Sequence, residues 1–315
     1  MGPYLVRRLG GMVLTLLLLT FAIVVFARMV NTDVIDVLLG DRTADPQLRA
    51  ELEERLGINK SVPEEYVSYV AGAVRGDLGK SLLSGRPVRL MITDRVWVTL
   101  QLAIAALLIG ATTGMTIGVL SALKQDGATD YALRSFAIVG LTIPNFALAT
   151  AAIILPTIYL QWTPPLIYKP FSEDAWGHTK QFILPALILG FGLMGTQMRI
   201  MRTQMLEVLR QDYIRTARVK GLGSGTVVIR HALRNALIPV ISLLGLQVAV
   251  IFSGSVVLEQ IFGLPGMGTM LLQAVQQKDW PVVQGITLVI GVWVVLVNLL
   301  VDLSYTILDP RLKVS

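Results

Sequence analysis

Long uncharged runs dominate the hydrophobic pattern of this chain. Each run approaches or exceeds the roughly 18–20 residues that a helix needs to cross about 30 Å of hydrocarbon. The runs cover residues 9–27, 96–123, 135–168, 181–198, 235–258 and 280–301. The pattern therefore predicts an all-α membrane protein with six transmembrane helices.

Two of these runs have features that decide how they are interpreted. The run 9–27 is long for the apolar part of a signal peptide, and no small-residue cleavage site follows it, so we expect it to remain as an uncleaved first helix. The run 135–168 is too long for one span. Pro164 and Pro165, which follow Trp162, predict that this helix ends there, with the aromatic ring near the headgroups.

The segments between the runs predict two further features. Residues 31–94 carry eleven acidic and eight basic residues, which indicates a small polar domain after the first helix. Within it, Pro46 and Gly57 bound a predicted short helix, 45–57. The uncharged stretch 260–277 is rich in glycine and proline, and we expect it to be re-entrant or interfacial because irregular backbone is not exposed to lipid.

The basic residues of the short loops predict the orientation in the membrane. Fourteen of them lie on the side of the N-terminus, whereas three lysines lie in the short loops of the other side. By the positive-inside rule, both termini are expected in the cytoplasm. The expected division is residues 1–30 (N-terminus and first helix), 31–94 (extracytoplasmic insertion), 95–307 (core, with a cytoplasmic loop 199–235 and an outer re-entrant segment 259–280) and 308–315 (cytoplasmic tail).

The composition narrows the possible chemistry. Charged residues make up 15% of the chain, against about 25% in soluble domains. Cysteine is absent, which excludes disulfides and thiolate metal sites. Of the two histidines, His178 is expected to be solvated and His231 to serve packing. Asp302 is the clear carboxylate within a span, with an expected structural or interfacial role.

No catalytic or metal-binding constellation is recognised. The spans contain scattered amides, which are Asn145, Gln197, Gln247 and Asn298. The glycine-rich stretch 221–225 lacks the Lys-Ser/Thr ending of a phosphate-binding loop. We therefore expect that the chain is not an enzyme and does not hydrolyse ATP.

One span carries a packing signal. Gly110, Gly114 and Gly118 recur at four-residue spacing and so share one face of the helix over 96–123. Small residues on one face allow two helix backbones to approach closely. The strip predicts a tight helix contact but indicates nothing about a substrate.

The segment 199–235 concentrates the positive charge. Its eight basic and two acidic residues give it a net charge of +6, equal to that of the whole protein. Asp212 is the predicted N-cap of a helix from Tyr213 to Lys220 that Gly221 and Gly223 end, and Ser224 is the predicted cap of a second helix, 227–235. Tyr213, Ile214 and Ala217 would offer an apolar contact face within a basic rim.

Two interpretations of this segment remain open. Basic helices beside a membrane bind anionic lipid headgroups. A lipid-binding patch, however, needs no glycine turn between two capped helices, so the arrangement favours docking of a partner protein. Nucleic-acid binding is not expected, because basic residues of membrane proteins usually gather on the cytoplasmic side.

The motifs of the segment resemble a known family. Arg215-Thr216-Ala217-x3-Gly221, followed by His231-Ala232-Leu233-Arg234, is similar to the EAA loop of ABC importer permeases in its spacing. Arg215 and Thr216 replace Glu and Ala, and His231 and Arg234 replace Ile and Pro, as in the dipeptide, oligopeptide and nickel branch. Further similar motifs are Tyr4–Leu9, Gly76–Ser81, Leu141–Phe146, Phe262–Gly268, Asp279–Gly285 and Asp309–Arg311.

The whole chain thus resembles the B-type permease subunit of a dipeptide/oligopeptide importer. The resemblance implies a type I ABC importer permease fold in the cytoplasmic membrane, with lipid around it and an extracytoplasmic insertion after helix one. It also implies as partners a second, C-type permease, one or two ATP-binding subunits that hold ATP and Mg, and an extracytoplasmic peptide-binding protein. No cofactor is expected on this chain.

The resemblance assigns coupling to the ATPase to one set of residues: Tyr213, Ile214, Arg215, Thr216, Ala217, Arg218, Lys220, Gly221, Leu222 and Gly223. It does not identify substrate-binding residues. Nickel or another small solute remains the alternative substrate. A secondary transporter, which should show charged residues at the membrane midplane, and an intramembrane enzyme are the more distant alternatives.

Overall fold

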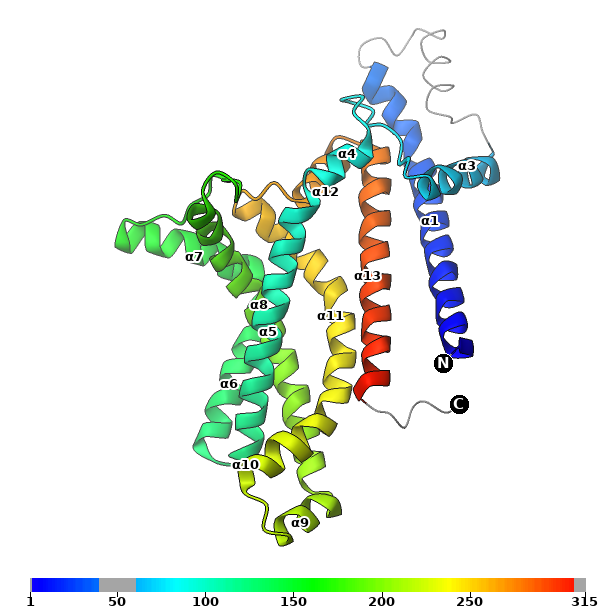
Figure 1. Cartoon of the computed structure of the whole chain (residues 1–315). Helices are drawn as coiled ribbons and strands as arrows, with labels where there is room; N and C mark the ends of the chain where they lie inside the picture. Colours follow the sequence, from blue (N-terminus) through cyan, green and yellow to red (C-terminus); the bar gives the residue numbers. More distant parts are fainter. Residues whose placement is uncertain (1, 40–60, 309–315) are drawn as a thin grey trace. The chain divides into compact units, whose positions relative to one another are not determined.

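The described chain is almost entirely helical. The computed structural model describes residues 2–39 and 61–308 (Figure 1). No strand occurs in these ranges, which contain one isolated β-bridge between Lys80 and Pro87. The predicted helix 45–57 lies outside the described residues. The helices are α1 Gly2–Leu39, α3 Val62–Val74, α4 Val88–Thr93, α5 Val96–Leu123, α6 Ala128–Thr142, α7 Asn145–Leu160, α8 Ala175–Leu209, α9 Asp212–Val219, α10 Ser224–Thr226, the π-helix η2 Val227–Leu233, α11 Arg234–Ile261, α12 Met267–Gln276 and α13 Trp280–Leu308.

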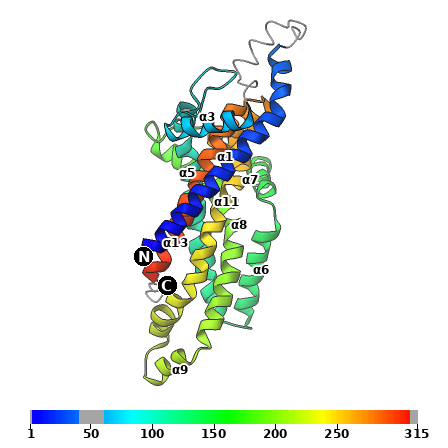
Figure 2. The ribbon, with the colours of Figure 1, turned by 90° about the vertical axis from the view of Figure 1, so that its right-hand side faces the viewer.

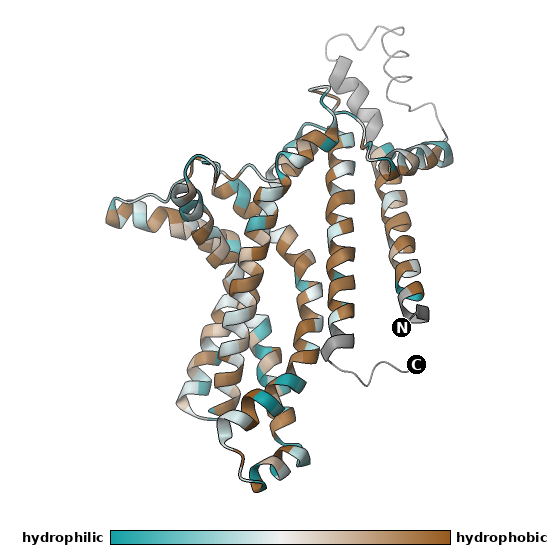
Figure 3. Cartoon of the chain, in the orientation of Figure 1, coloured by the Kyte–Doolittle hydropathy of each residue, from teal (hydrophilic) through white to brown (hydrophobic). Residues whose placement is uncertain are grey.

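The described helices supply up to six membrane spans. Five segments are long and apolar enough to cross a membrane, and α6 with α7 makes a sixth if this bent pair is one span. The five are Val6–Met29, Val88–Leu123, Ala175–Leu209, Ser224–Ile261 and Trp280–Ser304. Hydrophobic residues follow the lengths of these helices, whereas hydrophilic residues gather on α9 and just before α11 (Figure 3). The predicted fold class is in agreement with this architecture.

The third uncharged run forms two helices, α6 and α7, rather than the single helix that its sequence had suggested. α6 and α7 meet at an angle of 95°. Pro144 has no N–H to donate and disfavours helical backbone at the residue before it, and Ile143 accordingly is extended (φ −82°, ψ 122°). The predicted end near Trp162 is close to the observed one, since α7 stops at Leu160.

The fourth run is longer than its uncharged part. The helix α8 extends over 35 residues and includes 199–209, which the sequence had suggested to be loop. Charged residues near its C-terminal end do not interrupt it because arginine, methionine, glutamine and leucine are all good helix formers. The connecting segment is therefore shorter than 199–235 and begins after Leu209.

The described residues form two compact units. Unit 1 contains the residues up to Trp97 together with Met270–Val295, and unit 2 contains Val98–Thr269 together with the residues from Leu296 onward. In unit 1, Tyr66 of α3 donates to the carbonyl of Leu17 at 3.0 Å. Asp279 accepts hydrogen bonds from the Ser81 hydroxyl at 2.5 Å and from the Leu82 N–H at 3.0 Å. These bonds fix the loop before α4 against the start of α13.

The glycine strip of α5 packs on α8 in unit 2. A Cβ atom at Gly114 would lie 2.6 Å from Cβ of Gln197 and 2.7 Å from the carbonyl oxygen of Met194. Equivalent atoms at Gly110 and Gly118 would meet α8 at 2.7 Å. The predicted close helix contact is confirmed, and its second helix is α8.

His178 is buried, so the prediction that it is solvated is wrong. Its exposed fraction is 6%, and its ring contacts the rings of Tyr168 and Phe182. The ring nitrogens lie 2.9 Å from the carbonyl oxygen of Lys169 and 3.0 Å from Oε1 of Gln101. Asp174 caps α8 just before this histidine by accepting from the Gly177 N–H, and the helix start thereby turns the ring inward.

A second buried group in unit 2 escaped the sequence analysis. Glu259, at the end of α11, is fully buried. It accepts from the Thr99 hydroxyl at 2.6 Å and from the Thr269 N–H at 3.0 Å, and the same hydroxyl accepts from the Met267 N–H at 2.8 Å. The Thr99 hydroxyl and the Glu259 carboxylate thus accept from N–H groups in the first turn of α12, which have no partner within the helix.

Candidate functional site

The basic segment after α8 begins with the short helix α9. Gln211 is the N-cap, with extended backbone (φ −71°, ψ 148°), and Asp212 is the first helical residue rather than the predicted cap. A carboxylate in the first turn and Arg218 in the last turn both complement the helix dipole. The segment lies at the opposite end of unit 2 from the loop 161–174 (Figure 2).

The predicted apolar contact face of α9 is mostly turned inward. Ile214 is fully buried and Ala217 is 8% exposed. Both belong to a cluster with Met201 and Met205 of α8 and Ala232 of η2. Residues three apart share a helix face, and here that face covers the chain's own core. Ile214 and Ala217 therefore hold α9 in place, and in this chain the predicted contact face is buried against the chain's own core.

The other face of α9 and its turn are exposed. We call this the outward face of α9; it consists of Tyr213, Arg215, Thr216, Arg218, Val219, Lys220, Gly221, Leu222 and Gly223. Val219 is 87% exposed, and Tyr213 and Leu222 are about 40% exposed. The Tyr213 hydroxyl accepts from Nδ2 of Asn235 at 2.8 Å, which ties the helix to the start of α11. Eight of the ten predicted coupling residues thus lie on one accessible surface.

Gly221 ends α9 as predicted. Its φ is +80°, a conformation that glycine adopts at little cost. The Leu222 N–H donates to the Ala217 carbonyl at 3.3 Å, and the Gly221 N–H donates to the Arg218 carbonyl at 3.0 Å. This is the usual way in which a C′ glycine satisfies the last carbonyls of a helix.

The second predicted helix has a different form. Gly223 is the N-cap of α10, and Ser224 is its first residue rather than the predicted cap. From Val227 to Leu233 the backbone is a π-helix that continues into α11. A π-helix places an extra residue in each turn and is frequent at functional sites. Here it leaves Val227 and Ala232 buried in the cluster that holds α9.

A buried ion pair connects three helices of unit 2. Asp130 in the first turn of α6 is fully buried. Arg202 of α8 donates to its two carboxylate oxygens from Nε at 2.9 Å and from Nη2 at 2.6 Å. The Ser121 hydroxyl of α5 and the Asp126 N–H also donate to Asp130. We call these four groups the Asp130 brace. Among the described residues, no group of three metal-ligating side chains is placed to hold an ion.

The sequence analysis missed the brace. In the sequence, Asp130 falls in the short charged segment between two uncharged runs, and its spacing gives no indication of a partner 72 residues away. The one available signal was Arg202, a basic residue within a long helix that needs a partner when it is buried.

Comparison with known proteins decides the family. Residues 114–314 match the model of the binding-protein-dependent transport system inner membrane component, and residues 1–103 match the N-terminal model of such membrane components. The chain belongs to this family. It is thus an inner-membrane component of binding-protein-dependent transport systems, with several membrane-spanning helices.

Full-length relatives and solved structures agree with this family. The chain is 37% identical to the di/tripeptide transport system permease protein DppB of Pseudomonas aeruginosa and 36% identical to the dipeptide transport system permease protein DppB of Escherichia coli, with 99% of each chain covered. A putative peptide permease of Brucella ovis is 37% identical over 95% of both chains.

The solved structures establish the fold. In an inward-facing structure of the MetNI methionine ABC transporter, one chain matches with a TM-score of 0.56 at 17% identity, over 70% of this chain and 97% of that one. An amino acid ABC transporter crystallised with histidines gives a TM-score of 0.51 at 15% identity, over 68% and 92%. The type I ABC importer permease fold is confirmed.

Proposed function

We propose that this chain is the permease subunit of an ABC importer that moves short peptides into the cytoplasm. The observation that carries the proposal is the 36–37% identity to dipeptide and di/tripeptide permeases over 99% of both chains. All three relatives described above are named for peptides, which favours peptides over the nickel or small-solute alternative.

The partners follow from the kind of transport system. A second, C-type permease would complete the passage, and one or two ATP-binding subunits would hold ATP and Mg and supply the hydrolysis. An extracytoplasmic peptide-binding protein would deliver the substrate. The outward face of α9 would dock on an ATP-binding subunit, because it combines exposed apolar groups with a basic rim on one surface.

The proposed orientation places both termini and the segment containing α9 in the cytoplasm. Residues 31–94 and 259–280 would then form the outer surface. The fourteen basic residues on the side of α9 support this orientation. The bonds from Ser81 and Leu82 to Asp279 also support it, because they join a residue of each outer segment on one side of the membrane.

Uptake into proteoliposomes tests the function directly. The complete complex, with loaded binding protein on one side and ATP on the other, is expected to accumulate labelled di- to pentapeptides. This chain alone should show neither uptake nor ATP hydrolysis. Saturable nickel uptake without peptide uptake would support the alternative substrate, and uptake driven by an ion gradient without ATP would exclude an ABC importer.

Two charge substitutions on α9 test the coupling surface. Val219→Glu should leave α9 folded, since Val219 is 87% exposed, but it should weaken binding of the ATP-binding subunit at least about tenfold by placing an unpaired charge in the contact. Ala217→Glu should instead release α9 from α8, because Ala217 is buried. Co-purification measures the first effect, and limited proteolysis between α8 and α10 measures the second. Normal ATPase binding by Val219→Glu would show that another surface docks.

A further inference from the structure

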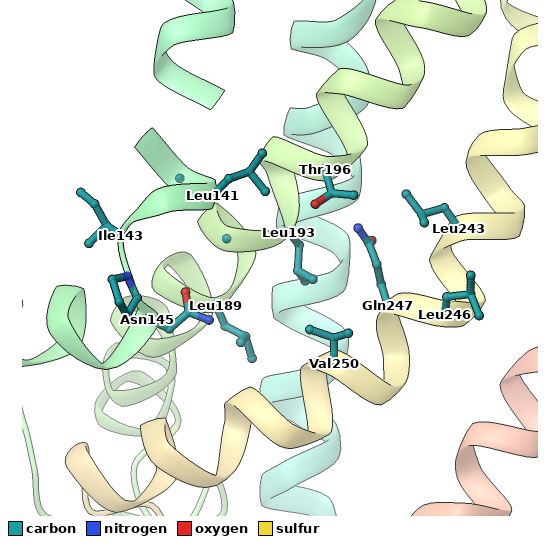
Figure 4. Close-up of a pocket in the computed structure, with 13 residues that line it drawn as sticks. Leu141, Ile143, Asn145, Leu189, Leu193, Thr196, Leu243, Leu246, Gln247 and Val250 are labelled. Carbon is teal, nitrogen blue, oxygen red and sulfur yellow. The ribbon is translucent and has the colours of Figure 1, made fainter. Parts of the chain in front are cut away.

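A cavity lies in unit 2 beside the break between α6 and α7. Its volume is about 420 Å³, and its walls come from α6, α7, α8 and α11. None of its thirteen lining residues is ionisable. Its polar side chains are Asn145, Thr196 and Gln247, and Leu193 and Val250 are among the apolar ones (Figure 4).

The cavity follows from the local sequence. Pro144 ends the helical backbone, so α7 turns away by 95° and leaves the wall of α8 uncovered. Gly140 keeps α6 close to α8 just before the break, where an added Cβ would lie 2.8 Å from the carbonyl oxygen of Phe191. Gly192 offers no side chain to fill the space, and Asn145 Oδ1 approaches it instead. The opening is thus encoded by a proline and two glycines.

The polar groups on its walls have unused hydrogen-bonding capacity. Within the described residues, neither Asn145 nor Thr196 makes a side-chain hydrogen bond. Thr179, on the same helix as Thr196, shows the common alternative, a bond from its hydroxyl to the carbonyl of Ala175 at 2.8 Å. A threonine that faces a cavity without this bond retains both a donor and an acceptor.

Gln247 has a fixed orientation with one end available. Nε2 of Gln197, which is fully buried, donates to Oε1 of Gln247 at 3.1 Å. This bond leaves the Nε2 donor of Gln247 on the cavity wall. Among the described residues, Oε1 of Gln197 is itself buried without a hydrogen-bond partner, and an unsatisfied buried acceptor of this kind lowers the stability of the fold. Asn145 lies on one side of the cavity, and Thr196 and Gln247 lie toward the other (Figure 4).

We infer that this cavity is a transit site for the backbone of the peptide, an inference that rests on the proposed function. A peptide group presents one N–H and one C=O, and side-chain amides and a hydroxyl match both without regard to the peptide's side chains. The volume falls within the range of roughly 300–1,000 Å³ of small-ligand pockets. Neutral hydrogen bonds hold a ligand weakly enough for it to leave, as conduction requires.

Substitution of the polar groups tests this site in the complete complex. The double variant Asn145→Ala with Thr196→Val removes two neutral hydrogen-bonding partners, and peptide uptake into proteoliposomes should fall about tenfold. Thr179→Val is the matched control, because it removes an exposed hydroxyl from the same helix and should not change uptake. Assembly of each complex is checked by size-exclusion chromatography.

Chemical labelling provides an independent measurement. The chain contains no cysteine, so Thr196→Cys introduces a single thiol. With ATP and binding protein present, an unlabelled dipeptide should slow its maleimide labelling at least threefold, whereas Ser253→Cys, exposed on α11, should show no protection. If the wild-type complex takes up peptide, the double variant takes it up equally well, and dipeptide does not slow labelling at position 196, the transit site would be refuted while the proposed function stands. Absence of any wild-type peptide uptake would refute the proposed function itself.

Discussion

Gly114→Val is expected to prevent α5 from packing on α8. The first added carbon would lie 2.6 Å from Cβ of Gln197 and 2.7 Å from the backbone oxygen of Met194. Because one of these atoms belongs to the backbone of a helix, the neighbour is not able to rotate away. The helices must separate, and the loss of packing should cost about 3 kcal/mol or more, at the upper end of overpacking effects.

The measurement is the apparent melting temperature of the purified protein in detergent, together with the yield of folded chain in the membrane. Gly11→Val is the matched control. Gly11 also lies in a transmembrane helix, but an added Cβ there would meet no atom within 4 Å. Gly11→Val should therefore melt close to wild type. If Gly114→Val does the same, the approach of α5 to α8 is not as close as described.

The glycine strip also illustrates what can be read from the sequence. Its period of four residues places three glycines on one helix face, and the close contact follows from covalent geometry alone. The lengths of the uncharged runs predict the spans for an equally local reason. The partner of the strip was not predictable, because which helix packs on α5 depends on contacts between residues far apart in the chain.

The sequence could not show which apolar faces and charged residues are buried, because burial also depends on contacts between residues far apart in the chain. Ile214 and Ala217 form an apolar face in a basic helix, and the sequence alone does not tell whether such a face meets a partner or the chain's own core. The bend at Pro144 was missed because transmembrane helices often tolerate proline when neighbouring groups satisfy the freed carbonyl. The sequence around His178 gave no indication that it is buried, because its contacts come from residues far apart in the chain, such as Gln101 and Tyr168.

The Asp130 brace provides the second large expected effect. Asp130→Asn keeps one acceptor oxygen and turns the other into an NH2 donor, so one of the bonds from the Ser121 hydroxyl and the Asp126 N–H is lost. It also leaves Arg202 without its counter-charge in a mostly buried position, where the side chain is 18% exposed. Breaking a buried pair from one side typically costs about 3–5 kcal/mol. We therefore expect a marked loss of thermal stability and of assembled complex.

A double-mutant cycle separates this coupling from the effect of each substitution. Arg202→Gln alone should also destabilise the chain, because it leaves the Asp130 carboxylate buried without its cation. The combination of Asp130→Asn with Arg202→Gln should be less harmful than the sum of the two, since neither charge then remains. Simple additivity would indicate that the two residues do not interact in the folded protein.

The exposed pair of Arg86 and Asp94 is the appropriate comparison for the brace. Its atoms approach to 3.1 Å, but both side chains are 58% exposed. Water already solvates these charges, so Asp94→Asn should change stability by less than about 1 kcal/mol. The difference expected between the two pairs arises from burial rather than from distance. The brace ties the last turn of α5 and the first turn of α6 to α8. If α9 couples to an ATP-binding subunit as proposed, a rigid base of this kind would transmit its movement to the transmembrane helices.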